Sequence, residues 1–249
     1  MGTSFNRIAY EALDVCNGVE MTTLERALAR TGLQPGARAV DIGTGNASVA
    51  IRAAERFGLT VTAIEYDPVM AELARARIDA SPVLDRVTLV VGSAAGVLAQ
   101  AQPADLIVAL GTTAVTGEAR PAPEAAFAFL KDRLKPGGWL LWGDLVWLAE
   151  PPGPLRQITE ATNLYADDAG WRTAATGAGF EVVSGEVSPQ PVFDAYAAAA
   201  DRAARDWLER HADAPEAATV RASADRVKMI FDFGRPFIGF GLYLLRAPG

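Results

Sequence analysis

The feature that most constrains this chain is a regular alternation of short apolar segments with amphipathic helical patterns. Continuous apolar runs are typical of strands buried on both faces of a parallel sheet, whereas the segments between them repeat apolar residues with helical spacing. We expect strands at residues 38–42, 60–64, 87–91, 104–110, 138–145, 180–187 and 237–245. Strands that alternate with helices in this way predict an α/β fold with helices on both faces of one sheet.

Composition limits the kinds of partner and site. A length of 249 residues with half of them apolar favours one large domain over two. A net charge of -7 argues against a nucleic-acid partner, because phosphate binding needs clustered Lys and Arg. A single cysteine, Cys16, and a single histidine, His211, exclude an intrachain disulfide and a Cys/His zinc site. The sequence has no secretory or membrane-spanning pattern, so we expect a cytoplasmic protein without a membrane partner. We expect it to be a monomer or a homodimer.

The stretch between the sixth and seventh expected strands carries two further helical patterns, over residues 192–231. Capping patterns begin at Thr22 for an N-terminal helix, at Asp67 after the second strand, and at Asp213 for the second of these two helices. Periodicity does not distinguish helices that pack on the domain from helices that cover a substrate, so both readings stay open.

A glycine-rich turn follows the first strand, with the sequence Asp41-Ile42-Gly43-Thr44-Gly45-Asn46-Ala47. Glycine lets the backbone approach a bound ligand closely, because a side chain would collide with it. Glu65 ends the second strand, 24 residues after Asp41. A carboxylate at that place accepts both hydroxyls of a ribose, so the pair of features favours an adenosine-containing cofactor.

These residues lie in longer runs that resemble class I S-adenosylmethionine-dependent methyltransferases. Residues 36–45 resemble motif I, residues 64–68 the acidic second-strand motif, residues 91–94 the segment that holds adenine, and residues 134–138 the turn before the fifth strand. The four runs occur in the same order as in the family. Together they are a much more specific signal than any one of them alone. The resemblance implies a Rossmann-like, doubly wound sheet of seven strands with an antiparallel seventh, and S-adenosylmethionine as the cofactor, released as S-adenosylhomocysteine.

The resemblance also implies the residues that bind the cofactor. Asp41 would orient the methionine ammonium, Glu65 would hold the ribose, and Tyr66 would flank the adenine. The complete expected set is Asp41, Gly43, Thr44, Gly45, Glu65, Tyr66, Gly92, Ser93, Ala94, Leu110 and Gly111. Two residues depart from the family pattern: Ala47 replaces the third glycine of motif I, and Ser93 stands where many relatives have an acidic residue. We expect both changes to be tolerated.

Ligands of parallel α/β sheets bind at the carboxyl ends of the strands, and the acceptor of the methyl group is expected there. Asp144 is our first candidate for a general base and His211 the second, although a capping carboxylate and a surface histidine are commoner roles for such residues. The expected substrate-binding residues are Tyr10, Thr112, Thr113, Trp147 and Tyr196. No Asp/Asp/Asn constellation follows strands four and five, so we expect no metal.

The expected organisation is one domain over residues 1–249. It comprises an N-terminal helical segment (1–35), a Rossmann-like core (36–190), a helical lid (191–235) and a last strand (236–249). Topology places this insertion at the cofactor edge, since the sixth strand should end, and the antiparallel seventh should begin, there. Our hypothesis is that it covers the acceptor together with the N-terminal segment at residues 10–21. The start at residues 5–8, this insertion and the ending at residues 237–241 also resemble a little-characterised bacterial subgroup of these enzymes, which implies no particular substrate.

The function that this reading favours is methyl transfer to an oxygen or nitrogen of a small molecule by in-line displacement. A protein that binds the cofactor without transferring methyl remains an alternative. A nicotinamide-dependent oxidoreductase is disfavoured, because its fingerprint needs a glycine where this chain has Ser48. A nucleic-acid methyltransferase is disfavoured by the acidic balance and by the lack of an Asn/Asp-Pro-Pro-aromatic motif or a Pro-Cys nucleophile.

Overall fold

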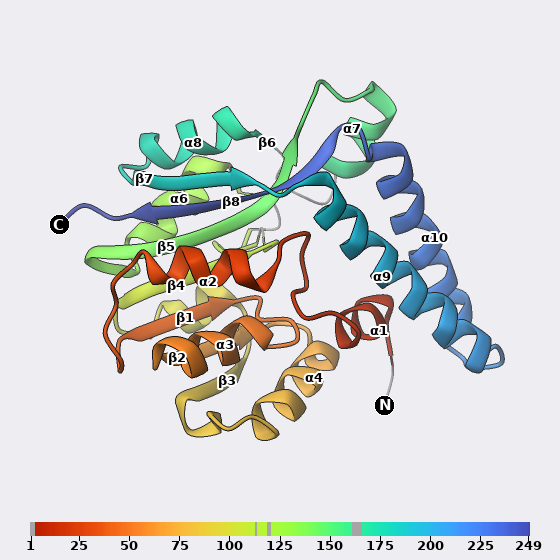
Figure 1. Ribbon diagram of the computed structural model, residues 1–249, viewed down its shortest axis with the longest axis horizontal. Helices are drawn as coiled ribbons and strands as arrows, with labels where there is room; N and C mark the ends of the chain where they lie inside the picture. The colour runs from red at the N-terminus through yellow and green to blue at the C-terminus, as the bar shows by residue number, and fades with distance from the viewer. Residues whose placement is uncertain (1–2, 113, 119–120, 161–165) are drawn as a thin grey trace.

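The computed structural model describes residues 3–112, 114–118, 121–160 and 166–249, and its centre is a single twisted sheet (Figure 1). The strands are β1 (Arg38–Ile42), β2 (Thr60–Glu65), β3 (Val87–Val91), β4 (Ala104–Leu110), β5 (Leu134–Trp147), β6 (Ala166–Asp167), β7 (Glu181–Val187) and β8 (Ile238–Arg246). Their order is β3-β2-β1-β4-β5-β8-β7, and β6 pairs with β5 outside this path. Strands β1 to β5 pair in parallel, while β8 runs antiparallel to β5 and β7. The expected sheet and its antiparallel last strand are confirmed.

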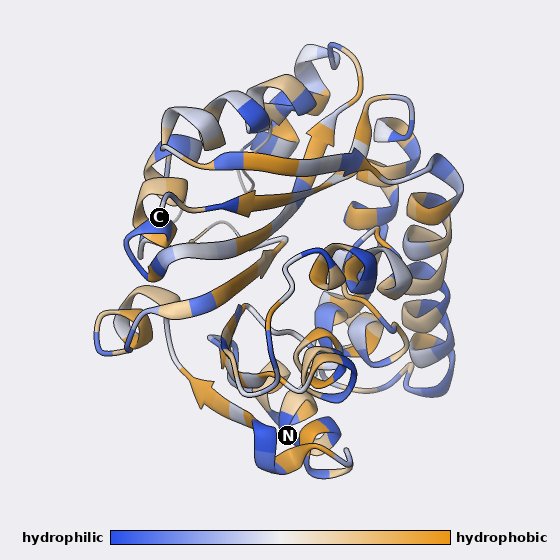
Figure 2. Ribbon diagram, turned by 60° about the vertical axis from the view of Figure 1, so that its left-hand side comes forward, coloured by the Kyte–Doolittle hydropathy of each residue, from blue (hydrophilic) through white to orange (hydrophobic). Residues whose placement is uncertain are grey.

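Helices cover both faces of the sheet. One face packs against α2 (Met21–Ala29), α3 (Ser48–Phe57) and α4 (Pro68–Asp79), and the other against α5 (Ala94–Leu98), α6 (Pro123–Lys131) and α8 (Asp168–Gly177). Figure 2 shows hydrophobic residues along the central strands and hydrophilic residues along the outer helices. Trp142 and Trp171 are fully buried on the second face, 5.4 Å apart between ring centroids. Burial on both faces explains why these strands have continuous apolar sequences.

A third helical layer lies over one end of the sheet and is here called the cover: α1 (Phe5–Glu11), α9 (Gln190–Arg210) and α10 (Ala217–Gly234). It has a small apolar cluster of its own, formed by Ile8, Leu208, Ala217 and Val220. Helices α9 and α10 connect β7 to β8, and the short helix α7 (Gly153–Glu160) contacts α10. Helix α1, near the start of the chain, therefore packs against α9 and α10, which come shortly before the last strand. All three lie above the carboxyl ends of the parallel strands (Figure 1).

Several boundaries differ from the sequence-based expectation. Strand β5 begins at Leu134 instead of residue 138, because Leu134 pairs with Ala104 across an irregular step in the register. The two-residue strand β6 was not expected, since two residues give no periodic pattern. Asp67 caps α4 as expected, by accepting a hydrogen bond from the N–H of Val69 at 2.9 Å.

The other two expected caps were wrong. Helix α2 begins at Met21, a buried core residue, so Thr22 lies within its first turn and Glu20 occupies the cap position without a side-chain bond. Helix α10 begins at Ala217, because the chain before it forms tight turns in which Ala217 N–H bonds to the carbonyl of Ala214. Asp213 lies before this turn and does not cap the helix. In the described part of the chain, no helix is long and apolar enough to cross a bilayer.

Candidate functional site

The glycine-rich turn after β1 uses left-handed backbone conformations at Gly43 (φ 64°), Gly45 (φ 58°) and Ala47 (φ 61°). Ala47 is the one non-glycine residue with positive φ in the described chain. A left-handed alanine costs roughly 1–2 kcal/mol relative to the right-handed conformation, and Ala47 is fully buried in the core. The turn thus tolerates Ala47, as expected, but at an energetic penalty that explains why glycine is the usual residue there.

Two buried carboxylates flank this turn. Asp41 is 4% exposed and accepts a hydrogen bond of 2.6 Å from the hydroxyl of Thr44. Burial raises the pKa of Asp41 to about 7; the Thr44 bond opposes this shift and the negative charge of Glu65 adds to it. Glu65 accepts hydrogen bonds from the backbone N–H groups of Gly45 (2.9 Å) and Asp67 (3.0 Å). Burial also raises the pKa of Glu65, and these backbone bonds counteract it.

Two exposed side chains lie at the ends of the neighbouring strands β2 and β3. Tyr66, directly after β2, is 77% exposed, and Val91, at the end of β3, is 50% exposed. Ser93 accepts a bond from the N–H of Gly96 and thereby caps α5, while Gly92 N–H bonds to the carbonyl of Glu65. An exposed aromatic face beside a buried carboxylate has the composition needed to hold a nucleoside, with the base on the ring and the ribose on Glu65.

The N-terminal segment lies directly on this turn. The side-chain amide of Asn46 donates to the carbonyls of Tyr10 (3.0 Å) and Leu13 (2.8 Å). Arg77 of α4 donates to the carbonyl of Glu11 at 2.7 Å. A Cβ added to Gly45 would lie 3.2 Å from the sulfur of Cys16.

The same segment closes on the end of β4. A Cβ added to Gly111, which has φ 63°, would lie 2.4 Å from Oδ1 of Asn17. Sequence reasoning missed Asn17, Cys16 and Arg77 as neighbours of the turn, and no periodic or motif signal marks them. Asn46 had a signal, because it lies inside the motif.

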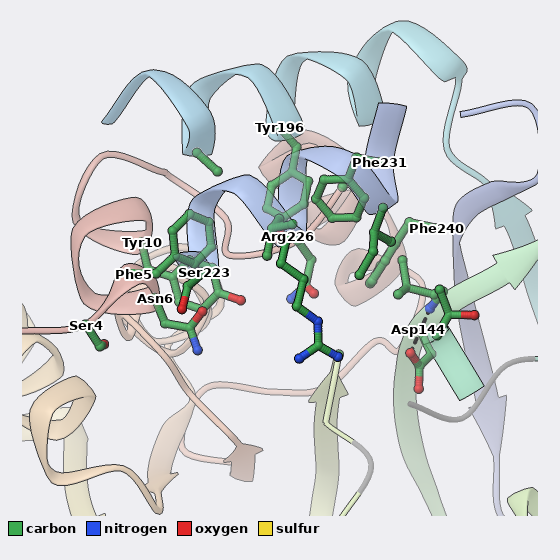
Figure 3. Close-up of a pocket in the computed structure, with 18 residues that line it drawn as sticks. Ser4, Phe5, Asn6, Tyr10, Asp144, Tyr196, Ser223, Arg226, Phe231 and Phe240 are labelled. Atoms are coloured by element: carbon green, nitrogen blue, oxygen red, sulfur yellow. Dashed lines mark hydrogen bonds between the residues drawn. The ribbon is translucent and has the colours of Figure 1, made fainter. Parts of the chain in front are cut away.

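A cavity of about 460 Å³ lies between the cover and the carboxyl ends of β4 and β5 (Figure 3). Its walls combine aromatic and aliphatic side chains with a few polar groups. The lining residues are Ser4, Phe5, Asn6, Tyr10, Asn17, Gly18, Gly111, Asp144, Leu145, Thr159, Tyr196, Ala200, Ser223, Arg226, Val227, Ile230, Phe231 and Phe240. A concave site that combines apolar walls with convergent polar groups, at the carboxyl edge of such a sheet, is a common form of small-molecule site.

Asp144 lines this cavity from β5 and is only 2% exposed. Its Oδ1 atom accepts the N–H of Leu145 at 2.7 Å, whereas its buried Oδ2 atom has no hydrogen-bond partner among the described residues. Burial raises the pKa of Asp144 to about 8, and the bond from Leu145 offsets part of this shift. A carboxyl group with this pKa exchanges a proton close to neutral pH, as a general base or acid must.

The other predicted substrate and catalytic residues lie in different places. Tyr10 and Tyr196 line the cavity, and burial raises the pKa of Tyr10 to about 12. Thr112 lies beside the glycine turn, since a Cβ on Gly43 would be 3.2 Å from its side chain. Thr113 lies outside the described residues.

Two predicted residues are not brought to the cavity. Trp147 is buried in the core and its ring lies 5.7 Å from the guanidinium of Arg156. His211 ends α9, where its ring stacks on Trp207 at 4.7 Å and its Nδ1 is 2.9 Å from the Trp207 carbonyl oxygen. Neither is among the residues that line the cavity.

The residues of the glycine turn fit an adenosine cofactor with a cationic amino-acid part. The buried Asp41 supplies negative charge, Glu65 has further acceptor capacity for hydroxyl groups, and Tyr66 offers an aromatic face. For a metal the described residues offer no cluster of three or more His, Cys, Asp or Glu side chains.

Comparison with known proteins agrees with this assignment. Residues 39–138 match a family model described as a methyltransferase domain. The Escherichia coli (strain K12) protein YjhP is 30% identical over 221 residues, which cover 86% of each chain. Its X-ray structure has a TM-score of 0.82 over 98% of this chain and 99% of that chain, at 26% identity.

A second solved structure resembles this chain equally well. The SAM-dependent methyltransferase from Geobacter sulfurreducens, in complex with S-adenosyl-L-homocysteine, has a TM-score of 0.82 and 26% identity, covering 97% of this chain and 96% of that chain. A tRNA1(Val) (adenine(37)-N6)-methyltransferase from Shewanella amazonensis is 38% identical over 91 residues, which are 36% of this chain and 38% of that protein. Together with the geometry of the glycine turn, these relatives show that the chain belongs to the class I S-adenosylmethionine-dependent methyltransferases.

Proposed function

We propose that this enzyme methylates an oxygen or nitrogen atom of a small molecule bound in the cavity beneath the cover. The observation that carries the proposal is the buried carboxyl group of Asp144, a residue that lines a cavity of small-molecule size and whose Oδ2 atom has no hydrogen-bond partner among the described residues. An ordinary buried carboxylate has its hydrogen bonds satisfied. A donor on the acceptor, either O–H or N–H, would supply the missing partner.

The residues of the glycine turn are proposed to hold the cofactor. Asp41 faces the methionine ammonium, Glu65 the ribose hydroxyls, and Tyr66 with residues 92–94 the adenine. At Gly43, Thr44 and Gly45 the backbone approaches the cofactor closely. Leu110 and Gly111 border the cofactor on the side of the cavity. When bound, S-adenosylmethionine supplies a methyl group that its sulfonium has already activated.

The protein's own contribution is then alignment and proton removal. The sulfonium of a bound cofactor would give up its methyl carbon to the acceptor atom and keep the electron pair of the broken carbon–sulfur bond. Asp144, in its ionised form, takes the proton that the acceptor atom loses. The cavity holds the acceptor in line with the methyl group, and such positioning supplies much of the rate of a displacement reaction.

The charge and shape of the site favour a small acceptor over a nucleic acid. The chain carries a net charge of -7, and the cavity lies between packed helices of the cover. The Shewanella tRNA methyltransferase aligns with only 36% of this chain, so its alignment does not span both the glycine turn and the cover. The cover is proposed to act as a lid on the acceptor, formed by residues 191–235 with the N-terminal segment.

The experiment that tests this proposal measures S-adenosylhomocysteine formation from S-adenosylmethionine with a panel of small phenols, carboxylic acids and amines, and separately with tRNA. We expect turnover with a member of the small-molecule panel. Asp144→Asn should reduce it by about a hundredfold or more, while the exposed Asp132→Asn control leaves it unchanged. Turnover with tRNA alone would contradict the proposal, and tight cofactor binding without turnover would favour a non-methylating role.

The lid is tested in the same assay with Ser223→Phe, which places a ring in the cavity from α10. Because none of the residues 41–47 of the glycine turn lines the cavity, we expect this variant to lose acceptor turnover and to keep its affinity for S-adenosylhomocysteine. Deletion of residues 192–231 should likewise reduce turnover more than cofactor binding. Equal loss of both by Ser223→Phe would contradict the lid.

A further inference from the structure

Arg226 lies on α10 and lines the cavity. Figure 3 shows its guanidinium extended from α10 into the space between α1 and the end of β5. Among the described residues that line the cavity, Arg226 and Asp144 are the two with charged side chains. No carboxylate of the described chain lies within ion-pair distance of Arg226, which is an exposed residue at the open side of the cavity.

Three other cations on these two helices, Arg205, Lys228 and Arg235, have carboxylate partners, whereas Arg202, Arg210 and Arg221 form no ion pair among the described residues. Arg205 pairs with Asp201 (3.1 Å) and with Asp225 (2.8 Å), so the acidic residue next to Arg226 in sequence is engaged elsewhere. On the same two helices, Lys228 pairs with Asp232 at 2.6 Å, and the end of α10 is tied to α9 by an ion pair of 2.8 Å between Arg235 and Asp194. Among the arginines of these helices that form no ion pair in the described chain, Arg226 is the one that lines the cavity.

The surroundings of Arg226 are neutral and able to form hydrogen bonds. Asn6 and Ser223 line the cavity from the cover, and Figure 3 shows both on the α1 side of the cavity. Beyond them the wall becomes apolar, with Val227, Ile230 and Phe231 on α10 and Phe240 on β8. The cavity thus has a cation at its open side, apolar walls, and a carboxyl group at the sheet.

A guanidinium is planar and presents paired N–H donors whose spacing matches the two oxygens of a carboxylate. We propose that the methyl acceptor is a small carboxylate-bearing molecule with an apolar, ring-sized body, whose carboxylate binds Arg226 while its reacting oxygen or nitrogen faces Asp144. This inference rests on the proposed function and narrows it to one chemical class of acceptor. The methyl transfer itself is unchanged, because Arg226 binds a part of the acceptor that does not react.

The test compares two probes that differ only in charge, 4-hydroxybenzoate and 4-hydroxybenzamide. Each is titrated calorimetrically into the complex of the full-length protein with S-adenosylhomocysteine. We expect the wild-type complex to bind the benzoate about ten- to a hundredfold more tightly than the benzamide, which is the usual effect of a hydrogen bond to a charged group. Arg226→Gln should abolish this preference, and Arg226→Lys should retain part of it, because a lysine keeps the charge without the fork of donors.

The matched control is Arg221→Gln, which removes an exposed arginine of the same helix that does not line the cavity. It should keep the wild-type preference. Failure of the wild-type complex to bind the benzoate, or equal affinity for the two probes, would overturn the inference. So would a loss of affinity for S-adenosylhomocysteine in Arg226→Gln, because Arg226 would then bind the carboxylate of the cofactor.

The outcome is separable from that of the proposed function. Methylation of neutral small molecules at a rate that Arg226→Gln leaves unchanged would confirm the proposed function and refute the carboxylate class. Selective binding of the benzoate through Arg226, with turnover only on tRNA, would refute the proposed function and confirm an anion site in the cavity.

Discussion

At the scale of single residues, the unusual feature of this protein is a set of carboxylates buried near its ligand sites. Asp41 and Asp144 are each at most 4% exposed, and burial raises their pKa values to about 7 and about 8. An ionised carboxylate in such a place is unfavourable until a cation or a donor approaches it. Both groups are therefore expected to change protonation when a ligand binds.

For Asp41 we predict that binding of S-adenosylmethionine releases protons near pH 7. The positive charge of the ligand favours the ionised form, so about half a proton should leave the group at a pH equal to its pKa of about 7. Affinity should weaken by up to about tenfold between pH 8 and pH 6. Calorimetry in buffers of different ionisation enthalpy measures the released protons, and Asp41→Asn is the control that should release fewer. Proton uptake by the wild type would contradict the assignment.

For Asp144 we predict an opposite effect of pH on stability and on catalysis. Its folded pKa of about 8 exceeds the unfolded value of about 3.9, so the folded state holds one more proton between these values. The free energy of unfolding should fall as pH rises, by about 1.4 kcal/mol per pH unit from this group between about pH 5 and pH 7. Turnover should instead rise through about pH 8, as the ionised base forms.

Urea denaturation of wild type and Asp144→Asn across this pH range isolates the contribution of Asp144, because Asp41 and Glu65 titrate in both proteins. The variant should lack the part of the slope that Asp144 supplies. Parallel stability curves for the two proteins would show that Asp144 titrates normally in the folded state.

At the scale of elements, the functional region depends on turns that hold separate segments in contact. The N-terminal segment meets the glycine turn through Asn46 and meets the end of β4 through Asn17. The Nδ2 atom of Asn17 donates to the carbonyl of Leu110 at 3.3 Å, directly before Gly111. These contacts hold in place the first 20 residues, which line the cavity together with α9 and α10.

We predict that Gly111→Ala destabilises the protein by more than Gly137→Ala. Both glycines have left-handed backbone, with φ of 63° and 70°, so each alanine carries the same backbone penalty of roughly 1–2 kcal/mol. A Cβ at Gly111 also meets Asn17 at 2.4 Å, whereas one at Gly137 meets nothing within 4 Å. The difference in unfolding free energy between the two variants measures the contact. Equal destabilisation would show that the N-terminal segment moves aside without loss.

At the scale of the whole molecule, one sheet carries both the cofactor turn and the cavity. Strands β1, β2 and β4 carry residues that we propose bind the cofactor, and the adjoining β5 holds Asp144. The cover is linked to the same sheet through β7 and β8 and to the glycine turn through the N-terminal segment. Ligand binding at the turn should therefore stabilise the molecule as one cooperative unit.

We predict that S-adenosylhomocysteine raises the melting temperature and NAD does not. At a concentration of 100 times its Kd, a ligand of the folded state adds about 2.7 kcal/mol, which corresponds to roughly 5–10 °C for a chain of this size. Differential scanning fluorimetry gives the shift, and Glu65→Gln should reduce it. Stabilisation by NAD would contradict the assignment of the turn.

The sequence alone determined the α/β sheet, because apolar periodicity is a local pattern. The Asp41–Gly45 and Glu65 motifs are local as well, and the resemblance that they carry to the methyltransferase family implied the antiparallel last strand. Local patterns also located Asp144 and the two helices of the cover. They misplaced Thr22 and Asp213 as caps, since the burial of Met21 and the turns before Ala217 decided where those helices begin.

Only the tertiary structure decided which of the remaining candidates share a cavity. Arg226, Asn6 and Asn17 come from segments far apart in the chain, and no spacing in the sequence predicts that packing brings them together. The same packing buried Trp147 in the core and left His211 at the end of α9. The physical reason is that strand and helix formation depend on neighbouring residues, whereas a cavity depends on how whole faces pack and on which charges that packing leaves without partners.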